Sequence, residues 1–150
     1  MANYYTQFSF DVPTKTVEHA DWLTRRIDEL REREGEDAPK TPLDQEIEDS
    51  GFGVDYERYG DHGIILFSDE SGNVEAVSLL LAEYLTAFSE IPDGIGFEWS
   101  GTCSKMCPDA FGGGACLVTR NGERYIDTSS WLSDEINELA GKSTATKLEG

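Results

Sequence analysis

The sequence predicts an α+β fold, a single antiparallel sheet with two long helices on one face. Three observations support this prediction. Short segments alternate apolar and polar residues, as strands with one buried face do. Two longer segments place apolar residues three and four positions apart, which is typical of amphipathic helices. Hairpin signals join neighbouring strand segments, and 150 residues suit a single domain.

The first strand and the first helix are expected before residue 35. Residues Tyr4–Val12 alternate apolar and polar side chains, and Pro13 ends the strand. A helix from about Thr16 to Glu34 follows and ends before Gly35. The apolar face of this helix consists of Val17, Ala20, Leu23, Ile27 and Leu30.

A short helix and a hairpin come next. Thr41 is a predicted N-cap, with Pro42 in the first helical position, and the helix ends near Ser50. The strands Phe52–Tyr59 and Gly63–Ser68 are then joined by a tight turn, which is a hairpin signal.

The second long helix is expected from Asn73, its N-cap, to about Ser89. Its apolar stripe shows the clearest helical periodicity in the chain. The residues of this stripe are Val77, Leu80, Leu81, Tyr84, Leu85 and Phe88.

The C-terminal third is predicted to hold a strand, a hairpin and a helix. Ile95, Phe97 and Trp99 alternate as a strand, and a loop rich in Cys and Gly covers Gly101–Gly114. Asn121-Gly122 is a strong hairpin signal. The turn joins strands at Ala115–Arg120 and Glu123–Asp127, and a last helix, capped by Thr128 or Ser129, is expected to bury Trp131, Leu132, Ile136 and Leu139.

This order of elements contains the ferredoxin-like pattern, followed by a C-terminal hairpin and helix. Residues 1–140 are expected to form one α+β domain, and the polar residues 141–150 a flexible tail.

The negative charge is concentrated in the middle of the chain. The net charge is −18, from 30 acidic and 12 basic side chains. Residues 28–98 hold twenty acids against four bases, a net of −16, whereas residues 99–150 have a net of −2. Direct nucleic-acid binding through a basic surface is therefore excluded, and an anionic membrane surface is disfavoured. No apolar run is long enough to span a bilayer.

Three cysteines, Cys103, Cys107 and Cys116, are the weak metal candidates. Their spacing matches no zinc signature, so we predict no metal and no cofactor. The odd number, and an N-terminus without the pattern of a secretory signal, indicate a reduced cytoplasmic protein.

Gly112, Gly113 and Gly114 allow positive φ and a close approach of another backbone. Their successive N–H groups suggest an anion-binding nest, although no phosphate-loop lysine follows them. A bulge leading into the next strand is the simpler interpretation.

Four motifs resemble a group of small proteins of bacteria and their mobile elements, for which no activity is known. The motifs are Tyr4-Tyr5-Thr6-Gln7-Phe8-Ser9-Phe10, Phe97-Glu98-Trp99-Ser100, Cys103-Ser104-Lys105 and Asp109-Ala110-Phe111-Gly112-Gly113-Gly114-Ala115. This chain has Met106-Cys107 where the group has Pro-Arg, so a basic residue is missing. The resemblance implies a compact α+β domain and marks the Cys- and Gly-rich loop for testing.

We predict a non-enzymatic binding protein that occupies a basic, nucleic-acid-binding surface of another protein. It would act as a DNA-mimic inhibitor or a nuclease immunity protein, with carboxylates in the place of phosphates. The two tyrosines among those acids suit an interface, because aromatic rings add contact area at little entropic cost. The predicted partner-binding residues are Asp28, Glu29, Glu32, Glu36, Asp37, Glu46, Glu48, Asp49, Asp55, Tyr56, Glu57, Tyr59 and Asp61.

Two alternatives stay open at this point. One is a small metal- or thiol-dependent enzyme built on the three cysteines and Gly112–Gly114. The other is an accessory domain of a salt-adapted cell, whose acidity has no charged partner.

Overall fold

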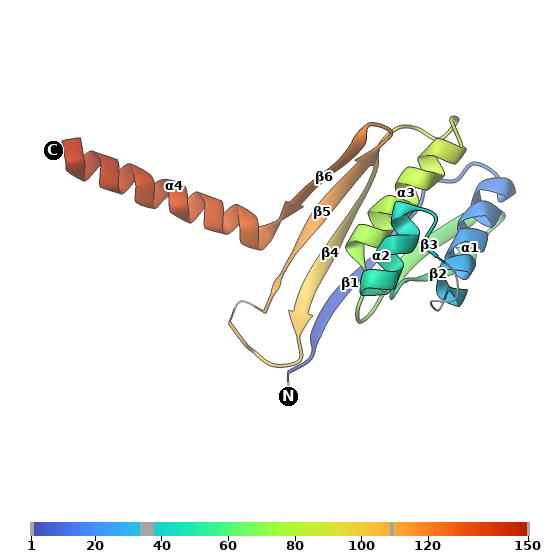
Figure 1. The fold of residues 1–150 in the computed structure, drawn as a ribbon, viewed down its shortest axis with the longest axis horizontal. Coiled ribbons are helices and arrows are strands. Elements are labelled where there is room, and N and C mark those ends of the chain that lie inside the picture. Colours follow the sequence, from blue (N-terminus) through green and yellow to red (C-terminus); the bar gives the residue numbers. More distant parts are fainter. Residues whose placement is uncertain (1, 34–37, 109, 150) are drawn as a thin grey trace.

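The computed structural model describes the backbone of residues 2–33, 38–108 and 110–149, and side chains as far as residue 141. Within these residues the chain forms one open, antiparallel sheet of six strands with four helices, so the α+β class is confirmed (Figure 1). The strands lie in the order β2-β3-β1-β4-β5-β6. In chain order the elements are β1 Tyr4–Asp11, α1 Val17–Glu32, α2 Pro42–Ser50, β2 Asp55–Tyr59, β3 Gly63–Ser68, α3 Val74–Ala87, β4 Ile95–Cys103, β5 Gly112–Thr119, β6 Gly122–Asp127 and α4 Thr128–Glu149.

The first three helices begin at side-chain caps. The hydroxyl oxygen of Thr16 accepts a hydrogen bond at the start of α1, and Thr41 does the same for the N–H of Asp44 in α2. Asn73 caps α3 in the same way. A side-chain oxygen at the cap satisfies one of the N–H groups that the first helical turn leaves unpaired. The predicted caps Thr41 and Asn73 are therefore confirmed.

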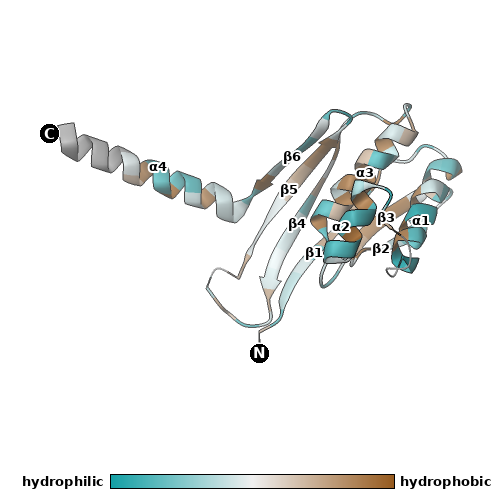
Figure 2. Cartoon of the chain, viewed as in Figure 1, coloured by the Kyte–Doolittle hydropathy of each residue, from teal (hydrophilic) through white to brown (hydrophobic). Residues whose placement is uncertain are grey.

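The core lies between one face of the sheet and the helices α1, α2 and α3 (Figure 1). Alternate strand residues supply the sheet side of this core, which explains the period-two pattern of the sequence. Phe8, Leu66, Phe97 and Val118 are buried representatives of β1, β3, β4 and β5. Figure 2 shows hydrophobic strands behind helices that are hydrophilic over much of α1 and α2.

The expected Cys- and Gly-rich loop is shorter than predicted. β4 continues to Cys103 and β5 begins at Gly112, with Gly113 opposite Ser100 in the ladder. None of the glycines 112–114 has a positive φ. A β-carbon on Gly113 would collide with the carbonyl oxygen of Trp99. The expected close approach of another backbone is thus confirmed, and the positive φ expected for a nest is not.

The prediction that α4 buries its apolar residues is wrong. α4 extends away from the sheet and packs against β5 and β6 where it begins (Figure 1). Trp131, Leu132, Ile136 and Leu139 are 53–66% exposed, because no other described element lies over them. The predicted cap is also displaced by one residue, since the carboxylate of Asp127 accepts the backbone N–H of Ser130 at 2.7 Å.

The boundaries of other elements differ by a few residues. The second strand begins at Asp55 rather than Phe52, and the two long helices end at Glu32 and Ala87. The backbone of α4 includes residues 141–149, and the flexibility of this segment stays a prediction.

Candidate protein-binding surface

Helix α1 lies along the edge strand β2, antiparallel to it. Near the start of α1 the carboxylate of Asp21 accepts a hydrogen bond from Arg58 at 2.6 Å. Near its end Arg31 forms an ion pair with Asp55, at the first residue of β2. Helix and strand therefore present their charged residues together along one edge of the molecule.

Two tyrosines of β2 are held by carboxylates of this edge. Tyr56 donates a hydrogen bond to Asp28 at 3.1 Å, and the guanidinium of Arg31 lies 5.5 Å from the centre of the Tyr56 ring. Tyr59 donates to Asp11 in β1. Partial burial and then the Asp28 carboxylate raise the pKa of Tyr56, and the hydrogen bond to Asp11 raises that of Tyr59. Both rings are oriented by the protein itself, as an interface residue requires.

Three other predicted carboxylates have partners within the molecule. Glu29 pairs with Arg26 at 3.4 Å, and Glu48 pairs with Arg33 at 2.9 Å. Asp49 accepts a hydrogen bond from Gln45. Glu48 therefore connects α2 to α1. Glu57 and Tyr59 lie on the face of the sheet opposite the helices, because they alternate along β2 with Tyr56 and Arg58, which contact α1.

The remaining predicted residues fall into two groups. Glu36 and Asp37 lie outside the described residues. Four acids have carboxylates that make no hydrogen bond or ion pair with any other residue that the structure describes, namely Glu32, Glu46, Glu57 and Asp61. We call the eleven described residues of the predicted set the acidic surface.

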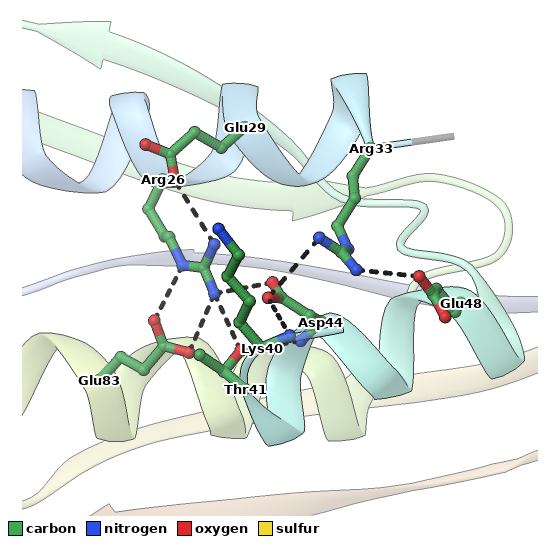
Figure 3. A network of polar contacts seen from close by, with 8 residues as sticks. All are labelled: Arg26, Glu29, Arg33, Lys40, Thr41, Asp44, Glu48 and Glu83. Carbon is green, nitrogen blue, oxygen red and sulfur yellow. Dashed lines mark hydrogen bonds and ion pairs between the residues drawn. The ribbon is translucent and has the colours of Figure 1, made fainter. Parts of the chain in front are cut away.

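A partly buried ion-pair cluster, with Asp44 at its centre, joins the three helices (Figure 3). Asp44 is 4% exposed and lies 3.1 Å from Arg26 and 3.7 Å from Arg33. Arg26 also forms two hydrogen bonds with Glu83 of α3, at 2.8 and 3.2 Å. The backbone N–H of Lys40 donates to the second oxygen of Asp44.

The pKa values of this cluster reflect both burial and pairing. Burial alone would raise the pKa of Asp44, but the hydrogen bonds from Lys40 and Arg26 outweigh it and lower that pKa. Burial likewise opposes the charge of Arg26, and Glu83 and Asp44 outweigh it and raise the Arg26 pKa. Both shifts favour the charged forms of Asp44 and Arg26, so this ion pair connects α1 to α2.

Sequence reasoning missed this cluster. The available signal was Asp44 itself, an acid three residues after the Thr41 cap. Nothing in the local pattern distinguishes it from the exposed acids around it, because its burial depends on how α1 and α3 pack against α2.

The three cysteines do not come together. Cys103 is the last residue of β4, whereas Cys116 of β5 lies opposite Phe97, six residues back along β4. At about 3.4 Å per residue this separates them by roughly 20 Å. Cys103 and the nearby Cys107 are partly buried, and Cys116 is buried. Among the described residues no group of three His, Cys, Asp or Glu side chains is placed to hold a metal ion.

His19 is held in the interior of the protein by hydrogen bonds and ring packing. The backbone N–H of Lys15 donates to its Nδ1 at 3.1 Å, so the proton of the neutral ring is on Nε2, which lies 2.7 Å from Glu90. The hydrogen bond from His19 lowers the pKa of Glu90. The ring is fully buried and packs on Phe88, which leaves it no open side for a substrate.

No family model, curated protein or solved structure matches this chain. The part of the chain that the structure describes contains no helix that is both long and apolar enough to cross a bilayer.

Proposed function

We propose that the chain is a non-enzymatic binding protein whose acidic surface occupies a basic, nucleic-acid-binding surface of another protein. The observation that carries this proposal is the net charge of −16 over residues 28–98, together with the exposed carboxylates that α1, α2 and β2 display. Carboxylates spaced along a rigid surface would pair with the lysines and arginines that otherwise contact phosphates.

The internal ion pairs support this interpretation. Residues 28–98 contain three arginines, and Arg31, Arg33 and Arg58 all pair with acids of the protein itself. These pairs fix the surface without neutralising it, because the acids of this part far outnumber the bases. A net field of this kind speeds encounter with a positive partner and makes the complex sensitive to salt.

The expected partner is a nuclease or another enzyme of nucleic acids, inside a reducing, cytoplasmic compartment. The chain would be an inhibitor of such an enzyme or an immunity protein against it.

Affinity capture tests the proposal. The chain is immobilised and exposed at low salt to a lysate of the source cells treated with nuclease, and bound proteins are eluted with rising salt. We expect a basic nucleic-acid enzyme, which the free chain then displaces from a DNA or RNA duplex. The proposal fails if the proteins retained include no nucleic-acid binder, or if the chain leaves their nucleic-acid complexes intact.

Two charge-reversal variants distinguish binding through the acidic surface from a general effect of the net charge on affinity. The first is Glu32→Lys, Glu57→Lys and Asp61→Lys, within the acidic surface. The second, matched in net charge, reverses exposed acids outside that surface, namely Glu98→Lys, Glu123→Lys and Asp134→Lys. The proposal expects a much larger loss of partner affinity in the first, whereas equal losses would indicate only a general charge effect.

A finer description of the fold is part of the same proposal. We propose that β1 to β4 with α1 and α3 form a ferredoxin-like core, on the basis of the order β2-β3-β1-β4 in one antiparallel sheet. The hairpin β5–β6 then extends this core beyond β4.

A further inference from the structure

The exposed apolar side chains are concentrated at the C-terminal end. Among the described residues, nine of the twelve exposed large hydrophobic side chains lie between residues 106 and 139. These nine are Met106, Phe111, Leu117, Tyr125, Ile126, Trp131, Leu132, Ile136 and Leu139. Four of them lie on α4 between residues 131 and 139, and exposed apolar patches on a small protein mark interaction surfaces.

The stability of helix α4 is not explained by packing against the rest of the described chain. Every described side chain from Thr128 to Gly141 is exposed. A single helix is marginal in water, and most helices in proteins are stabilised by packing of an apolar face. Leu132, Ile136 and Leu139 share one face of α4, at spacings of four and three, while Asp134 lies on the opposite face. This apolar stripe needs a cover.

The distribution of charge along the chain favours some sites over others for the approach of a second copy. Two copies of a chain with a net charge of −18 repel each other most strongly through residues 28–98. Residues 99–150 carry a net charge of only −2. Residues 128–141 of α4 hold three acids and no base, a net of −3, so the total repulsion that a second copy meets there is smaller than at residues 28–98.

The stripe also has the symmetry of a two-fold interface. Leu132 and Leu139 lie four and three residues from Ile136, so the stripe is nearly unchanged when α4 is reversed. In an antiparallel pair, Leu132 faces Leu139 of the other copy and the two Ile136 side chains meet at the centre. A two-fold interface requires this kind of self-complementary patch.

We propose that the protein forms a homodimer through antiparallel pairing of α4, with the stripe Leu132, Ile136 and Leu139 at its centre. Ile126 and Trp131 extend the apolar surface, since both line a concavity of about 490 Å³ where α4 leaves β6. These five side chains are about half exposed, which amounts to ~500 Å² per chain when an unpacked large side chain exposes ~200 Å². A standard interface buries about 800 Å² per partner, so the dimer is modest in affinity and needs flanking polar contacts.

The mass in solution across a dilution series tests this proposal. Sedimentation equilibrium of the full chain is expected to give a mass that rises from 16.6 kDa towards twice that value with concentration. Ile136→Lys should remain monomeric at every concentration, because it places a charge at the centre of the stripe. Asn137→Lys, which adds the same charge on the far side of α4, should dimerise like wild type.

Circular dichroism shows whether the variants stay folded, which is expected because both positions are exposed. A wild-type protein that is monomeric throughout would overturn the proposal, whatever else the stripe binds. The proposal is equally wrong if both lysine variants dimerise, or if both fail to.

Cysteine cross-linking tests the direction of pairing. Under mild oxidation Ile136→Cys should form a covalent dimer that wild type, with the same three native cysteines, does not form. Leu132→Cys alone should not cross-link, whereas a mixture of Leu132→Cys and Leu139→Cys should. Cross-linking of Leu132→Cys with itself would contradict the antiparallel arrangement. These outcomes are independent of the proposed nucleic-acid enzyme, because no partner protein is present.

Discussion

The acidic surface and the C-terminal end differ in the kind of side chain that they expose to water. In the acidic surface, charged groups are oriented by one another, as in the pairs Arg31–Asp55 and Arg33–Glu48. At the C-terminal end, exposed apolar side chains such as Ile136 and Leu139 have no cover among the described residues. The first region is ordered by contacts within one chain, whereas the apolar stripe of the second is buried only in the proposed dimer.

This difference has a physical origin. Ionised groups can stay in water at little cost, so a charged helix such as α1 needs only its buried stripe to be covered. Each unit of apolar area left in water is unfavourable, because burying that area would stabilise the protein. A dimer joined through α4 would also present two acidic surfaces at its two ends, so that two basic sites could be bound at once.

The largest expected effect is on the buried cluster that supports the acidic surface. Arg26→Met leaves Asp44 and Glu83 without their shared cation, and breaking a buried pair on one side costs about 3–5 kcal/mol. Urea denaturation should therefore show a strong loss of free energy of unfolding. Arg25→Met, at the exposed neighbouring position, is the control and should change that free energy by less than about 0.5 kcal/mol. Equal effects would show that the cluster does not fix the helices.

The second effect concerns the close packing of β5 at the C-terminal end. A β-carbon on Gly114 would collide with the Trp99 ring and with the carbonyl oxygen of Ile126. Gly114→Ala should lower the free energy of unfolding by about 1–3 kcal/mol, because the strands must move apart. On the partner strand, Gly101→Ala is the matched control, since its nearest contact would be an ordinary 3.8 Å. A tolerated Gly114→Ala would mean that this end of the sheet is loosely packed.

The third effect is a pH dependence of the cluster. The folded-state pKa of Asp44 is lowered from its ordinary value of 3.8, so its stabilisation is fully present above that value and is lost as the pH falls towards the folded pKa. Asp44→Asn should cost about 2 kcal/mol at neutral pH, in the range for hydrogen bonds to charged groups. Below pH 4 the difference from wild type should shrink. A difference that is constant from neutral pH to below pH 4 would contradict the assignment.

The smallest effect on the free energy of unfolding is expected at the exposed apolar stripe of α4. Leu139→Ala in dilute protein should change the free energy of unfolding by less than about 0.5 kcal/mol, because Leu139 is 66% exposed in one chain. Leu81→Ala, at a fully buried position of α3, should cost about 2–5 kcal/mol. At high concentration Leu139→Ala should become destabilising as the dimer is lost. A large effect in dilute protein would show that α4 packs within its own chain.

Local signals in the sequence were sufficient to predict the positions of most of the helices and strands. Thr41 and Asn73 identified helix starts, because a capping side chain acts on N–H groups only two or three residues away. The alternation of Phe8 and Phe10 identified β1 for the same reason, since strand period is a local property. The concentration of charge in residues 28–98 is likewise a fact of the sequence.

The sequence by itself therefore determined the α+β class, the helix starts and which part of the chain carries the charge. The tertiary structure alone decided that Asp44 is buried between Arg26 and Arg33, whereas the Glu32 carboxylate has no partner among the described residues. It also decided that the apolar face of α4 points to water. Both facts depend on which elements lie beside a residue in space. A helical periodicity states that a face is apolar, and only the packing of distant segments decides whether the same chain covers it.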